Sequence, residues 1–304
     1  MPDSHIWFAW QASKTGYCWW EDRQSGQELR VVGYLRSDAR QGLIERDRYL
    51  VANAEFEEAP SLTARSPLEA TGLFRDFAAL KPCDGEIREF ANRNGLLTDG
   101  RLVIAGDDAG DDDADFPGEP LSVWTQEIAR MSFLLQLWEL VENKDKRGLA
   151  QYIEWTEIFG HRGFRFKDPQ DRFPARDILG APWLAQVLRQ RDVLTPAQFI
   201  FDSLVTEQVS GQIDHAIFRD VRQRPSLRCV PRDLRTALWL QFAGAIEGSK
   251  EYQQCDECQT WFEIGSRQGG RSDKRFCSTA CRARNWRKTR STADKSAGRN
   301  PFKQ

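Results

Sequence analysis

The sequence predicts a mainly α-helical protein with a β-rich N-terminal region and a small C-terminal α+β module. Three observations lead to this fold class. The first 60 residues are rich in aromatic and β-branched side chains, residues 61 to 249 contain long stretches with apolar side chains at helical spacing, and four cysteines cluster near the C-terminus. We therefore expect a β-rich region over 1–60, a helical domain over 61–249, a compact module over 250–291 and a flexible basic tail over 292–304.

In the β-rich region, short strands are expected at residues 28–35 and 48–56. The tryptophans of this region are assigned to packed core rather than to a ligand surface, because large aromatics mostly supply buried area. The helical domain should begin with helices over 66–80 and 84–94, the second ending at Gly95, and continue with a long helix over 121–144. Further helices are expected around residues 146–159, 176–190, 195–222 and 232–247. The acidic run over 106–120 is expected to be a solvated loop.

Composition and charge exclude some classes of protein. The chain has 304 residues, 40% hydrophobic and 29% charged, and no apolar run approaches the roughly 20 residues of a membrane span. Its start, MPDSHIWFAW, lacks the pattern of a secretory signal, so we expect a cytoplasmic protein without a membrane partner, whose thiols stay reduced. From Lys250 onward there are 13 Lys and Arg against six Asp and Glu, which leaves the first 249 residues with a net charge of −9. An anionic partner would therefore meet the C-terminus.

The four clustered cysteines follow the pattern Cys255-x2-Cys258-x18-Cys277-x3-Cys281. Reduced cysteines in two closely spaced pairs are typical of a Zn²⁺ site, in which four thiolates form a tetrahedron. A sphere closed by four thiolates leaves no place for a reacting water, so we expect one structural zinc ion in a treble-clef-like module. Within the spacer, residues 259–265 and 274–276 are expected to pair as a hairpin, and Ser278 to cap a helix that carries the second pair. Trp261 and Phe262 are expected to form the small core of this module rather than to stack on bases.

The segments CDECQTWF (255–262) and KRFCSTACRARNWRKTR (274–290) resemble the zinc fingers that end bacterial proteins of the CGNR zinc-finger class. Those proteins join an N-terminal helical domain, often called ABATE, to the terminal finger, and they are described as stress-induced transcriptional regulators. The resemblance is clearest over residues 250 to 290, and residues 73–97 also resemble proteins of this layout. Where the Cys-Gly-Asn-Arg motif would stand, this sequence reads Cys281-Arg282-Ala283-Arg284. The resemblance implies zinc on the four cysteines and regulation of transcription.

Cationic side chains surround the second cysteine pair. A helix over 278–290 would carry positive charge on nearly all sides, and residues of the preceding spacer would extend this patch. Cations that neutralise phosphates release counterions, so nucleic acid is the expected partner, with DNA favoured over RNA by the resemblance. The expected contact residues are Arg267, Arg271, Lys274, Arg275, Arg282, Arg284, Arg287, Lys288 and Arg290.

Two other functions fit the same sequence. A closed zinc module with a basic helix could instead bind a protein or serve as a structural unit, including one that docks on the acidic part of its own chain. The weaker alternative is an RNA-cleaving enzyme, for which His161 with Arg162, Arg165 and Asp168 would form a polar site. We expect no enzyme, because the chain carries neither a Gly-rich phosphate loop nor a nucleophile elbow.

Overall fold

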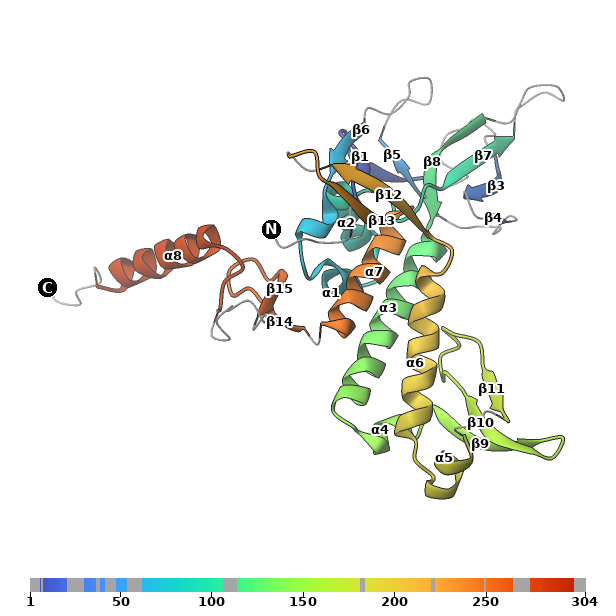
Figure 1. Cartoon of the computed structure of the whole chain (residues 1–304). Coiled ribbons are helices and arrows are strands. Elements are labelled where there is room, and N and C mark those ends of the chain that lie inside the picture. The colour runs from blue at the N-terminus through green and yellow to red at the C-terminus, as the bar shows by residue number, and fades with distance from the viewer. Residues whose placement is uncertain are drawn as a thin grey trace, which may run out of the picture.

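A mixed arrangement of helices and several small antiparallel sheets makes up the fold of the protein (Figure 1). The computed structural model describes residue 6 and residues 8–20, 30–36, 39–41, 48–53, 62–105, 114–180, 184–219, 222–248, 250–264 and 274–297. Among these residues, no helix is long and apolar enough to cross a membrane.

The largest sheet has six antiparallel strands in the order β2-β5-β8-β7-β3-β4. Strands β7 and β8 follow residue 60 in the chain, yet they lie between β5 and β3, which precede it. The sheet therefore crosses the domain boundary expected at residue 60. A separate pair, β1 (Trp10–Ser13) with β6 (Leu62–Arg65), lies beside it. The bounds of the six strands are β2 Tyr17–Trp20, β3 Arg30–Arg36, β4 Ala39–Gln41, β5 Tyr49–Ala52, β7 Arg101–Ala105 and β8 Ala114–Pro120.

Strand β8 corrects one expectation from the sequence. It occupies the second half of the acidic run that was expected to be a solvated loop, while residues 106–113 lie outside the described part of the chain. The Glu119 carboxylate on β8 is fully buried and accepts hydrogen bonds from the backbone N–H groups of Leu97 (2.9 Å) and Thr98 (2.6 Å). An acidic residue can therefore enter this sheet because backbone donors satisfy its oxygens.

The main core lies between the long helices α3 (Leu121–Glu142), α6 (Leu194–Val209) and α7 (Leu234–Glu247), together with α1 (Leu73–Ala78). The helix expected over 121–144 and that over 232–247 are confirmed, because their apolar faces are continuous and buried. Helix α2 (Asp84–Asn94) ends at Gly95, whose φ of 97° supplies the expected stop. The first expected helix is split, with a short 3-10 turn at Pro67–Glu69 before α1, and the Ser66 side chain does not cap it.

Residues 146–222 contain strands where helices were expected. Helix α4 (Lys146–Leu149) is one turn long, and the chain then forms a three-stranded sheet of β9 (Ile153–Ile158), β10 (His161–Phe166) and β11 (Arg176–Leu179). Phe159 and Gly160 both have positive φ, 52° and 78°, as a two-residue hairpin turn requires. The short helix α5 (Leu184–Gln190) follows β11. Helix α6 ends at Val209, and a second hairpin follows, β12 (Ile213–Arg219) with β13 (Pro225–Pro231).

The C-terminal module consists of a hairpin and a helix. Strands β14 (Glu251–Gln254) and β15 (Trp261–Ile264) pair antiparallel, and the hairpin lies against α1. Helix α8 (Thr279–Ala297) extends from the hairpin away from the body of the protein (Figure 1). Much of its surface is consequently left uncovered by the described parts of the body.

Candidate metal centre

The first cysteine pair lies on a tight turn between β14 and β15. The Cys255 N–H donates to the Thr260 carbonyl at 3.0 Å, and the Gln259 N–H donates to the Cys255 carbonyl at 2.8 Å. Gln259 has a φ of 60°, which turns the chain back sharply. This arrangement corrects the expected hairpin, since β15 pairs with β14 and not with residues 274–276. The two strands that flank the turn therefore hold its ends together.

The second pair lies at the start of α8. The Ser278 hydroxyl accepts a hydrogen bond from the Cys281 N–H at 3.2 Å, which confirms Ser278 as the helix cap. Cys277 precedes the cap, and Cys281 lies on the first turn of the helix. Residues four apart at a helix start share one side, so both thiols point toward the turn that carries the first pair.

The four cysteine Sγ atoms form one compact group, all within 4.8 Å of one another. The Sγ atoms of Cys258 and Cys277 are 3.6 Å apart, and those of Cys277 and Cys281 are 3.5 Å apart. Zn–S bonds of about 2.3 Å in a tetrahedron give S–S edges of about 3.8 Å. The residues thus fit a single tetrahedral ion, and no disulfide competes, because all four thiols are free. The group is suited to one metal ion such as zinc.

The electrostatics of the group also favour a cation. Burial disfavours the charged form of Cys255, but backbone N–H groups of Cys277, Cys258 and Glu257 outweigh it and lower the pKa of this thiol to about 6. Burial and the neighbouring thiols raise the pKa of Cys277 to about 12. Deprotonation of Cys255 is therefore easy, whereas deprotonation of Cys277 beside the other thiols costs much free energy. A divalent ion removes that cost, because coordinated thiols are deprotonated outright.

A small apolar core supports the thiols. Phe262 packs against the buried Cys255 and Cys281, with Ile264 and Phe276 at its edge, so the expected role of Phe262 is confirmed. Trp261 lies on the other side of the hairpin and faces the body, where the Arg75 guanidinium lies 5.1 Å from its ring centroid. The expectation that Trp261 belongs to the core of the module is therefore wrong. Alternation along β15 places these two neighbours on opposite faces.

The basic residues of α8 separate into two groups. Arg284 and Lys288 face the metal group, where the carboxylate of Glu257 lies 3.8 Å from Arg284 and 2.6 Å from Lys288. The Glu257 side chain is only 6% exposed, and the Arg284 guanidinium also donates to the Cys281 Sγ at 2.9 Å. Such a contact to a ligand atom stabilises thiolate charge. Glu257 was not predicted from the sequence, although an acidic residue between two ligand cysteines, followed by a basic helix, was a usable signal.

The second group lies about 100° or more around the helix axis from Cys281, by the helical repeat. Arg282, Arg287 and Arg290 are exposed and surround Trp286, which is 58% exposed. The Arg290 guanidinium lies 4.7 Å from the centre of the Trp286 ring. Among the side chains that the structure describes, which in α8 end at Arg290, no acidic one forms an ion pair with any of these three arginines. We call Arg282, Trp286, Arg287 and Arg290 the outer face of α8.

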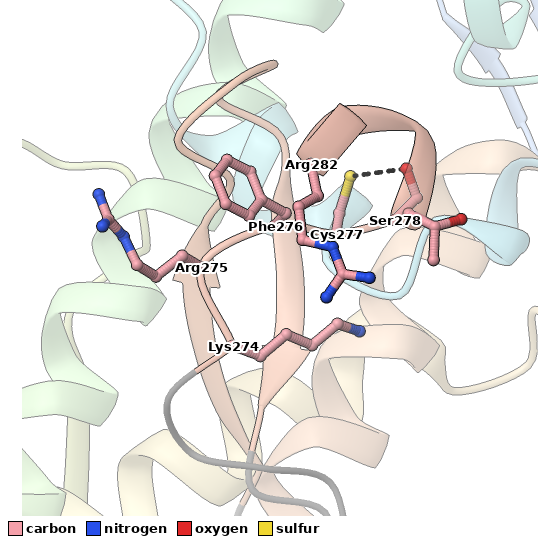
Figure 2. A pocket seen from close by; sticks show the side chains of 7 residues that line it. Lys274, Arg275, Phe276, Cys277, Ser278 and Arg282 are labelled. Carbon is pink, nitrogen blue, oxygen red and sulfur yellow. Dashed lines mark hydrogen bonds between the residues drawn. The ribbon is translucent and has the colours of Figure 1, made fainter. Parts of the chain in front are cut away.

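A hollow of about 590 Å³ lies at the start of α8. Lys274 and Arg282 point into it, whereas Arg275 points away, as Figure 2 shows. Arg275 donates to the Asp256 carboxylate at 2.7 Å, and the Lys274 ammonium lies 5.2 Å from the Phe262 ring centre. Arg267 and Arg271, which were expected to extend the patch, lie outside the described residues.

The side chains proposed for RNA cleavage do not form one site. Arg162 donates to Glu157 at 3.0 Å, and Arg165 donates to Asp177 at 2.8 Å. Asp168 is buried and accepts from Arg172 and from backbone N–H groups that follow it, which holds a loop. His161 is exposed at the end of β10. Each charged group is thus occupied by a separate local contact.

Comparisons with protein-family models, with curated proteins and with solved structures found no match to this chain. What the structure supports is the coarser statement that the four C-terminal cysteines form a group consistent with a zinc-binding module.

Proposed function

We propose that the protein binds nucleic acid through a zinc-stabilised C-terminal module, with the outer face of α8 as the contacting surface. The observation that supports this best is the division of the basic residues. Arg284 and Lys288 neutralise Glu257 and the thiolates, while Arg282, Arg287 and Arg290 are exposed on the outer face, where no described acid pairs with them. Exposed cations on a projecting helix gain binding free energy from a polyanion by releasing its counterions.

The zinc ion would be structural in this account. Four thiolates close its coordination sphere, so the chain's own cationic residues perform the binding. Lys274 and Arg282 around the hollow at the start of α8 offer a further place for a phosphate. We propose DNA as the partner and regulation of transcription as the role, following the resemblance of residues 250 to 290 to zinc fingers of bacterial regulators.

The test is a binding titration across salt concentrations with the full-length protein. Replacing Arg282, Arg287 and Arg290 by Gln should flatten the slope of log affinity against log salt by roughly two to three units, if all three meet phosphates. A matched control replaces Arg147, Arg189 and Arg191 by Gln, which removes the same charge from exposed positions near α4 and α5. The control should retain the slope of the wild type. Absence of binding to DNA and RNA at about 50 mM salt would reject nucleic acid and favour a protein partner.

A further inference from the structure

The outer face of α8 carries an aromatic side chain that the fold does not explain. Trp286 is 58% exposed and belongs to no buried cluster, although every other tryptophan that the structure describes is buried or half-buried. On a helix with 3.6 residues per turn, it lies about 140° around the axis from the metal ligand Cys281. It therefore supports neither the metal group nor the body.

The surroundings of the ring give it a defined orientation. The Arg290 guanidinium stacks over the ring, with 4.7 Å from its carbon to the ring centre, and covers one face. Arg282 and Arg290 lie four residues before and after Trp286, which places each about 6 Å from it along the axis. The indole ring is thus flanked along the helix by two cations.

We propose that Trp286 stacks on an unpaired base, and that single-stranded nucleic acid is the partner bound by the outer face of α8. The proposal rests on the proposed function and specifies its ligand. A base that stacks on the ring brings its two neighbouring phosphates to either side, where Arg282 and Arg290 can neutralise them. Arg287 adds a cation on the flank of the same face.

A base in duplex nucleic acid cannot stack on the Trp286 ring in the same way. In a duplex the bases stack on one another and present only their edges in the grooves. Contact with the face of Trp286 would require a base to be extruded, at the cost of its pairing and stacking. An apolar protein surface is also a poor match, since covering the ring would desolvate the arginines around it without a counter-charge.

The experiment measures the affinity of the zinc-loaded full-length protein for a short labelled DNA strand, for the duplex of the same sequence and for the matching RNA strand. Three variants of the ring distinguish stacking from apolar contact: Trp286→Ala, Trp286→Phe and Trp286→Leu. Phe159→Ala is the matched control, because Phe159 is 97% exposed on the β9–β10 turn, far along the chain. The four variants change two exposed positions, Trp286 and Phe159, so folding should be unaffected.

We expect both single strands to bind more tightly than the duplex. Trp286→Ala should weaken single-strand binding roughly 5- to 150-fold without changing the salt slope, because stacking contributes about 1–3 kcal/mol per base. Trp286→Phe should retain most of the affinity, and Trp286→Leu should resemble the alanine variant. A preference for one of the two strands identifies DNA or RNA as the ligand.

Two results would overturn the inference while leaving the proposed function intact. One is equal binding of strand and duplex, both unaffected by Trp286→Ala yet weakened by the arginine substitutions. The other is full affinity in Trp286→Leu, which would indicate apolar contact instead of stacking. If the wild type binds no nucleic acid at low salt, the proposed function fails together with the inference.

Discussion

Arg75 on α1 should hold the metal-binding hairpin on the body of the protein. Its guanidinium lies 5.1 Å from the ring centre of Trp261 and 5.2 Å from that of Tyr252, both on the hairpin. On the body it lies 5.5 Å from the ring of Trp138 and 3.7 Å from the carboxylate of Glu139. The side chain is only 14% exposed, and its burial lowers the pKa of the guanidinium from its usual value. One cation thus connects aromatic rings of both parts.

The expected effect of Arg75→Ala follows from these contacts. A largely desolvated cation–π contact contributes roughly 1–2 kcal/mol. Losing the contacts of Arg75 with the Trp261 and Tyr252 rings should therefore weaken docking of the hairpin by about 2–4 kcal/mol. Two hydrogen bonds report on docking directly, since the N–H groups of Trp261 and Glu263 donate to Asp76 (3.1 Å) and Thr71 (3.4 Å). Their hydrogen exchange should become roughly 30- to 1000-fold faster.

Native-state hydrogen exchange measured by NMR on zinc-loaded protein tests this prediction. Arg162→Ala is the control, because Arg162 also forms an ion pair, with Glu157, but lies on β10 and is 75% exposed. It should leave exchange of the hairpin within about twofold of the wild type. Unchanged exchange of the Trp261 and Glu263 amides in Arg75→Ala would show that the hairpin docks without the Arg75 cation and would contradict this prediction.

Two further predictions concern the metal and a buried acid. Cys277→Ser should lose the zinc measured by elemental analysis and unfold only the C-terminal module, whose own core is small, whereas the exposed Cys83→Ser should retain zinc. Burial raises the pKa of Glu119 to about 7 from 4.5, so the folded state holds this proton more tightly than the unfolded state. Protonated Glu119 therefore adds up to about 3 kcal/mol to the free energy of unfolding below pH 4.5, and this contribution is lost as the pH rises to about 7. Urea unfolding at pH 5.5 to 8 should show this decline in the wild type and not in Glu119→Gln, and parallel profiles would contradict it.

Periodicity predicted the fold where one pattern dominates a long segment. Helices α3 and α7 were predicted because their apolar stripes are long and continuous. The hairpin of β9 and β10 was missed, since each strand is only six residues long and half-exposed. The Phe159-Gly160 turn was the available signal. Strand β8 was missed because its acidic composition is typical of a loop. The Glu119 carboxylate is accommodated in the sheet by the backbone N–H groups of Leu97 and Thr98, and no local sequence pattern shows this tertiary contact.

The metal group was predictable because ligand spacing is a local property, and the structure brings Cys255, Cys258, Cys277 and Cys281 together as expected. The division of the basic helix was not predictable from the helical repeat alone. That repeat places Arg284 and Lys288 near the side of Cys281, but it does not reveal that Glu257 lies opposite them. The role of Trp261 depends on Arg75, which is 186 positions earlier in the chain.

The most direct test of the account is whether nucleic-acid binding depends on one zinc ion. Affinity for labelled DNA would be measured at about 50 mM salt before zinc removal, after chelation at neutral pH, and after zinc is restored. We expect binding to be lost on chelation and regained in full at one equivalent of Zn²⁺ per chain, because the four thiolates position α8 and its outer face. Equal binding by the zinc-free protein, or a purified protein that holds no zinc, would contradict it.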